Sequence, residues 1–185
     1  MKILKLPHRA TVEDLLALDE KAELVNGQIV LMGGDGFDHN RPKQLVWMSL
    51  YLHEVKHGGG YAIGDGGVFL VQLPNRESFG PDVAWSEIRH TGPAFHGPPA
   101  LAVEIRSPGD YGLRAERNMA AKRAEYFAAG TGVVWDVDVL REQVIRVYRA
   151  DDPEHAALYR RGEVAEAEPA VPGWRFPVDE LFPGQ

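Results

Sequence analysis

The chain has 185 residues, a formal net charge of −7 and no cysteine. The lack of cysteine excludes a disulfide framework and any thiolate metal site, and the acidic balance argues against a surface coated in basic charge for gripping phosphates. A local basic groove is still compatible with that balance. We expect one domain over residues 1–185, a length that supports a sizeable core.

The N-terminal segment lacks the long apolar stretch of a signal peptide. No run approaches the roughly 18 apolar residues that a membrane span needs. We therefore expect a cytoplasmic protein with no membrane association, which suits a chain without cysteine.

The N-terminal region is predicted to hold a short helix followed by a hairpin. Thr11 precedes the acidic pair Glu13-Asp14, which is typical of an N-cap and first turn, and the helix should run through Leu18. Residues 23–31 contain two β-type runs around Asn26-Gly27. Asn-Gly supplies the positive φ angles of a type I′ turn, so these runs should pair.

A loop over residues 33–40 leads into a helix predicted from Arg41 to His57. The glycine run 58–60 ends this helix, as glycine beyond a helix C-terminus commonly does. Apolar residues recur in it at helical spacing, namely Leu45, Met48, Leu52 and Val55.

The rest of the chain alternates strands with one further helix. We expect strands at residues 61–63, 68–73, 82–85, 101–106, 133–137 and 144–148, with a short one near Leu158. A Gly- and Pro-rich loop covers residues 89–99, and a helix runs from Leu113 to Ala129, closed by Gly130. The segment Pro172-Gly173-Trp174 should lie on the surface. This order indicates one α/β domain.

Two acidic residues stand in predicted strands. Asp82 opens one strand, and Glu104 lies inside the apolar run 100–105. Carboxylates are rarely buried without a partner, because an isolated buried charge is very costly; a shared divalent cation would satisfy both. Strand alternation puts Glu104 on one face with Ala102 and Arg106. The alternative is a structural salt bridge from Glu104 to Arg106 or to a helix cation.

The helix over residues 113–129 carries a basic residue that could serve the acids. Asn118, Lys122 and Tyr126 are spaced four apart and so share one face. Lys122 could reach the carboxylates and stabilise charge in a transition state. The alternative is a solvated helix face with ordinary basic residues, which include Arg114, Arg117 and Arg123.

Five motifs occur in an order that resembles the Uma-two family of restriction endonucleases, within the PD-(D/E)xK nuclease superfamily. They are Glu23-Leu24-Val25-Asn26-Gly27, His39 before a long helix, Pro81-Asp82, the run from Val103 to Pro108, and the run from Lys122 through Tyr126 and Gly130 to Asp138. The resemblance covers about residues 22–148, with a weaker match near Trp174.

The resemblance implies a restriction-endonuclease-like fold, a mixed central β-sheet flanked by helices. It also implies a Mg²⁺- or Mn²⁺-dependent endonuclease that hydrolyses phosphodiester bonds of DNA, working as a homodimer. The metal ligands would be Asp82, Glu104 and Glu23, and Lys122 would be the catalytic lysine. His39 matches a histidine that the family often shows before its long helix, and we expect substrate contacts from His39, Arg106, Arg114 and Tyr126.

The chain departs from the family pattern at two positions. Arg106 replaces the lysine of the E-x-K signature, and an arginine cannot lose its proton in a protein. It could clamp a phosphate but could not act as a base. Asn118 stands where family members often carry Asp. Both carboxylates that a hard cation such as Mg²⁺ would use are kept.

Two other functions compete with the nuclease interpretation. His53-Glu54-Val55-Lys56-His57 matches the H-E-x-x-H signature of zinc proteases. The predicted helix ends directly after His57, however, and the position six residues further on is Ile63 rather than a third histidine. The second alternative is a catalytically inactive nuclease-like module that binds nucleic acid or a protein partner.

Overall fold

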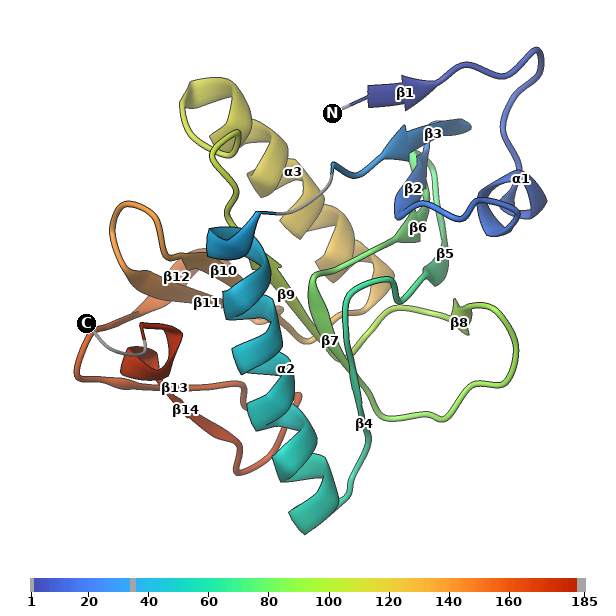
Figure 1. Cartoon of the computed structure of the whole chain (residues 1–185). Coiled ribbons are helices and arrows are strands. Elements are labelled where there is room, and N and C mark those ends of the chain that lie inside the picture. Colours follow the sequence, from blue (N-terminus) through green and yellow to red (C-terminus); the bar gives the residue numbers. More distant parts are fainter. Residues whose placement is uncertain (1, 34–35, 183–185) are drawn as a thin grey trace.

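The computed structural model describes residues 2–33 and 36–182 (Figure 1). Its N-terminal elements form as local sequence dictates. Helix α1 (Val12–Leu16) opens with a capping box, in which Thr11 Oγ1 accepts from Asp14 N and Asp14 Oδ2 accepts from Thr11 N. The predicted hairpin is confirmed as β2 (Ala22–Val25) and β3 (Gln28–Leu31), with Asn26 at φ 53° and Gly27 at φ 66°.

The hairpin belongs to a six-stranded sheet, here called the N-terminal sheet. Its order is β1-β3-β2-β6-β5-β8. The other members are β1 (Lys2–Leu4), β5 (Phe69–Leu73), β6 (Arg76–Phe79) and β8 (Phe95–His96). The sequence did not predict β6, nor β8 inside the Gly- and Pro-rich loop. Both strands are short and form because neighbouring strands pair with them.

A second six-stranded sheet forms the centre of the molecule. Its order is β12-β11-β10-β9-β7-β4, and only β9 and β10 run parallel. The strands are β4 (Tyr61–Ile63), β7 (Val83–Ser86), β9 (Leu101–Ile105), β10 (Val133–Asp138), β11 (Val144–Arg149) and β12 (Asp152–Arg160). The predicted mixed central sheet is thus confirmed.

Helices cover the two faces of this sheet (Figure 1). Helix α2 (Phe37–His57) packs on one face through Val46 and Leu50, together with the C-terminal hairpin of β13 (Val164–Glu166) and β14 (Arg175–Pro177) and the short 3₁₀ helix η1 (Val178–Leu181). Helix α3 (Leu113–Ala129) covers the other face, where Tyr126 packs with Phe79 of the N-terminal sheet. None of the described helices is long and apolar enough to cross a bilayer.

The core differs from the sequence patterns at two places, helix α2 and Trp174. Helix α2 starts at Phe37, four residues early, and its apolar stripe faces outward: Met48, Leu52 and Val55 are 51%, 60% and 66% exposed. Trp174, expected on the surface, is buried and stacks on Trp135 with ring centroids 4.8 Å apart. The reason is the same for both, because a local sequence pattern does not show which apolar surface will pack against another part of the chain.

Candidate active site

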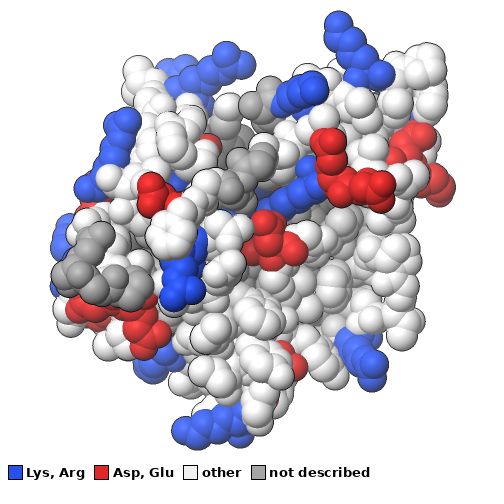
Figure 2. All heavy atoms as spheres, in the orientation of Figure 1, with Lys and Arg blue, Asp and Glu red and all other residues white. Residues whose placement is uncertain are grey.

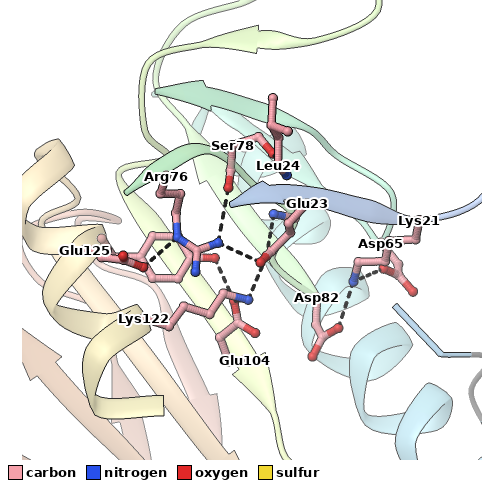
Figure 3. A network of polar contacts seen from close by, with 12 residues as sticks. Lys21, Glu23, Leu24, Asp65, Arg76, Ser78, Asp82, Glu104, Lys122 and Glu125 are labelled. Carbon is pink, nitrogen blue, oxygen red and sulfur yellow. Dashed lines mark hydrogen bonds and ion pairs between the residues drawn. The ribbon is translucent and has the colours of Figure 1, made fainter. Parts of the chain in front are cut away.

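A lysine joins two acidic residues from different sheets. The Lys122 ammonium on α3 lies 2.8 Å from Glu23 Oε1 on β2 and 2.8 Å from Glu104 Oε1 on β9 (Figure 3). Burial alone would lower the pKa of this lysine, but the carboxylates of Glu104 and Glu23 raise it above its usual range. Lys122 therefore stays protonated and acts as a fixed positive charge.

Glu23 is held as a carboxylate by several donors. Arg76 Nη1 donates to Oε2 at 2.7 Å, and Gly80 N donates to Oε1 at 3.0 Å. Arg76 is itself fixed by Glu125, which accepts from its Nε at 2.6 Å. Burial raises the pKa of Glu23, but Lys122 and Arg76 outweigh it and bring the pKa down to about 2.

The pKa of Glu104 is shifted in the direction opposite to that of Glu23. Tyr126 donates its hydroxyl to Oε1 at 2.6 Å, and the Lys122 ammonium contacts the same oxygen, so Oε1 has two donors. Burial raises the pKa of Glu104; Lys122 lowers it, and the charges of Asp82 and Glu23 raise it again. The net pKa lies above the usual range. A quarter of the side chain remains exposed, so this carboxylate is accessible.

Asp82 lies beside Glu104. Val83 pairs with Val103 in the antiparallel β7–β9 ladder, so the acids that precede and follow this pair share one side of the sheet. Asp82 Oδ2 accepts from Ile105 N at 2.9 Å, and Lys21 and Lys43 contact Oδ1 at 3.0 and 2.8 Å. Burial raises the pKa of Asp82, but the two lysines lower it to about 2.

The donor set fits a hard divalent cation only in part. Within residues 2–33 and 36–182, no three His, Cys, Asp or Glu side chains converge closely enough to hold a metal ion. The predicted trio of Glu23, Asp82 and Glu104 is not among such groups; Lys122 lies between Glu23 and Glu104, and Lys21 and Lys43 contact Asp82. Mg²⁺, however, commonly takes one or two carboxylates plus waters and substrate oxygens, and Asp82 and Glu104 are two carboxylates that could serve in this way.

The residues predicted to contact substrate are placed differently from one another. His39, in the first turn of α2, has Nε2 at 2.6 Å from Ile105 O and 3.7 Å from Asp82 Oδ2. Tyr126 is fully buried, so its hydroxyl positions Glu104. Arg114 is exposed near the start of α3.

Arg106 has to be corrected, because it does not line this site. Its guanidinium makes a bidentate contact to Asp136, with both bonds at 2.7 Å, and donates to both oxygens of Glu116 at 2.6 and 3.0 Å. The side chain is 5% exposed. Planar guanidinium matches carboxylates in this way, so Arg106 ties α3 to β10 instead of clamping a phosphate. Of the two structural salt bridges considered for Glu104, the one to Arg106 does not form, and the one to a helix cation forms with Lys122 of α3.

The H-E-x-x-H motif has other contacts. The His53 ring packs edge-on against Trp85, and Glu54 Oε2 accepts from Ala62 N at 2.7 Å. The glutamate that would activate water in a zinc protease instead fixes the start of β4. These contacts give the motif a structural role.

Four site residues were not predicted from the sequence: Lys21, Lys43, Asp65 and Arg76. Two signals could have found the lysines. Lys43 follows His39 by four residues, so both lie on one face of α2. Lys21 lies two residues before Glu23, so strand alternation puts both on the same face of the hairpin. Asp65 lies in the turn after β4 and carries no comparable signal.

Charge on the face that carries α2 is mixed. Figure 2 shows both signs, mainly around the rim and in the upper half, while the lower half over α2 is mostly uncharged. No continuous basic track crosses this view, in keeping with a formal charge of −7. The basic residues of the site are therefore not part of a longer basic track on this face.

Comparison with known proteins identifies a similar structure and a family. A crystal structure described as a "putative nuclease belonging to DUF820" from Anabaena variabilis ATCC 29413 superposes with a TM-score of 0.73, covering 93% of this chain and 97% of that chain at 17% identity, which shows a shared fold. No curated protein matches. A family model matches residues 11–179. The chain therefore belongs to the Uma2 family, described as "Putative restriction endonuclease".

Proposed function

We propose that the protein is a metal-dependent endonuclease that hydrolyses phosphodiester bonds of DNA in the cytoplasm. The observation that carries this proposal is the placement of Asp82 beside Glu104, whose side chain is a quarter exposed. Asp82 and Glu104 would hold the cation. A bound Mg²⁺ or Mn²⁺ would lower the pKa of a water molecule and neutralise charge on the phosphate.

The remaining residues would act through charge and position. Lys122, fixed by Glu23, supplies a positive charge next to Glu104 for the phosphate oxygens that become more negative in the transition state. Tyr126 keeps Glu104 in one orientation. Glu23 is engaged by Lys122, Arg76 and Gly80, so we assign it to orienting Lys122 and not to direct metal binding.

A plasmid-nicking assay tests this function. Supercoiled DNA incubated with the protein and Mg²⁺ or Mn²⁺ should be nicked, and Asp82→Ala should abolish nicking. His53→Ala is the matched control and should leave it intact. Stoichiometric zinc that is lost in His53→Ala would favour the protease, and a folded wild type that binds DNA without nicking it would favour the inactive module. A parallel RNA substrate separates the two nucleic acids.

The proposal extends to a homodimer by analogy, since many nucleases of this kind cut the two strands of a duplex with two subunits. Sedimentation at micromolar concentration should give twice the monomer mass of 20.5 kDa. A monomer that still nicks single strands would remove the dimer without removing the nuclease.

A further inference from the structure

Two lysines and two aspartates form a closed ring at the edge of the proposed site. Lys21 Nζ lies 2.5 Å from Asp65 Oδ1 and 3.0 Å from Asp82 Oδ1, while Lys43 Nζ lies 3.2 Å from Asp65 Oδ2 and 2.8 Å from Asp82 Oδ1 (Figure 3 shows the Lys21 side). The members come from the start of β2, from α2, from the β4–β5 turn and from the start of β7. The ring thus joins both sheets and a helix.

The ring places more positive charge on Asp82 than one carboxylate needs. Two ammonium groups share its Oδ1, and Ile105 N donates to Oδ2. Both lysines are largely removed from water, with side chains 18% and 5% exposed, whereas Asp65 is 35% exposed. Burying two ammonium groups is costly, and Asp65, the carboxylate that balances the second one, is the most exposed member of the ring.

The charge count of the wider network changes sign with a cation. Among the described residues, five carboxylates (Glu23, Asp65, Asp82, Glu104 and Glu125) face four cationic side chains (Lys21, Lys43, Arg76 and Lys122), which gives these nine groups a formal charge of −1. One divalent cation makes it +1, which a single phosphodiester would neutralise. Without the cation the network has no excess charge to attract a phosphate.

Resting on the proposed function, we propose that Lys21 and Lys43 form a phosphate-binding subsite, which Asp82 and Asp65 occupy in the metal-free protein and release when a divalent cation takes Asp82. Lysine binds phosphate as a point charge through three rotatable donors. The two carboxylate contacts of Lys21 leave it a donor for a phosphate oxygen. Metal and nucleic acid then bind as a coupled pair, each raising the affinity for the other.

Calorimetry of Mn²⁺ binding tests this coupling without relying on catalysis. The titration is run with and without a short phosphorothioate DNA duplex, which resists hydrolysis. For wild type, the duplex should tighten Mn²⁺ binding by about tenfold. Lys43→Met and Lys21→Met should each bind Mn²⁺ alone more tightly than wild type, because a competing cation has left Asp82, and the effect of the duplex should fall to near unity.

Two controls keep the outcomes distinct. Lys56→Met, on the exposed end of α2, should behave as wild type. Thermal melts show whether each variant folds; Lys21→Met, at the more exposed lysine, decides the result if Lys43→Met does not.

Each further outcome has one meaning. Lysine variants that bind Mn²⁺ more weakly, or that keep the wild-type coupling, would overturn the subsite and leave the nuclease standing. A folded wild type that binds neither Mn²⁺ nor the duplex would overturn the proposed function itself.

Discussion

Tyr126 and Glu104 share a hydrogen bond of 2.6 Å between a fully buried phenol and a carboxylate that stays accessible. Removing the hydroxyl in Tyr126→Phe keeps the ring, which stacks on Phe79. Hydrogen bonds to charged groups contribute about 1.5–3 kcal/mol. Because Lys122 still contacts Glu104, we expect the lower end of this range, about 1.5–2 kcal/mol.

Urea unfolding of Tyr126→Phe measures that loss, with an unchanged m value. Tyr51→Phe is the matched control, since Tyr51 is 42% exposed and its substitution should be neutral. If the two variants are equally stable, the phenol does not support Glu104.

Glu104 should make the metal-free protein less stable at high pH. Its folded pKa is raised, first by burial and then by Asp82 and Glu23 against Lys122, so folding favours the protonated acid. That contribution is present below the unfolded pKa and is lost as pH rises through the folded value. A cation that binds only the folded, ionised site restores stability by mass action, so Mg²⁺ should raise Tm more at pH 8 than at pH 5.

Glu104→Gln separates the two effects at pH 8. It should raise the metal-free Tm, since a carboxylate that prefers to be neutral is gone, and it should erase the response to Mg²⁺. Identical Mg²⁺ responses in wild type and variant would make Glu104 a structural ion-pair residue, and the catalytic proposal would fail with it.

Glu23 should have the opposite pH dependence. Its folded pKa of about 2 lies below the usual value of 4.5, because Lys122 and Arg76 outweigh burial. The carboxylate therefore contributes stability above pH 4.5, about 3 kcal/mol, which is lost as pH falls towards 2. Melts between pH 2 and 6 should show a shallower decline in Glu23→Gln than in wild type. Glu20→Gln, at an exposed acid, should follow wild type.

The corrected orientation of α2 predicts contrasting effects at neighbouring leucines. Leu50 is fully buried and Leu52 is 60% exposed. Leu50→Ala should cost about 2–5 kcal/mol, whereas Leu52→Ala should stay within about 0.5 kcal/mol of wild type. Denaturant unfolding of the pair measures both. Equal losses would mean that the outer stripe is covered in solution.

Local signals in the sequence were sufficient for several elements. The Asn26-Gly27 turn, the Thr11 cap and the Gly130 helix end each depend on backbone preferences of adjacent residues, and all three formed as predicted. The strands of Asp82 and Glu104 could also be predicted, because a charge in an apolar run is visible without a structure.

Features set by distant partners could not be predicted. Helix α2 has apolar residues on two faces, so spacing alone could not say that Leu50 and not Leu52 is buried. Trp174 looked like a surface residue until Trp135, 39 positions earlier, provided a stacking partner. Lys43 reaches Asp82 only because α2 folds across the central sheet. Each depends on contacts between segments that are far apart in the chain.

The Glu23–Lys122–Glu104 bridge spans two sheets, with one acid on each. The contacts of Lys122 with both acids therefore depend on the position of one sheet relative to the other. A perturbation that parts them by a few ångströms breaks the bridge while every strand ladder is still intact. Loss of activity on heating or under mild denaturant should then precede loss of secondary structure, and the first state reached is a folded protein without a working site.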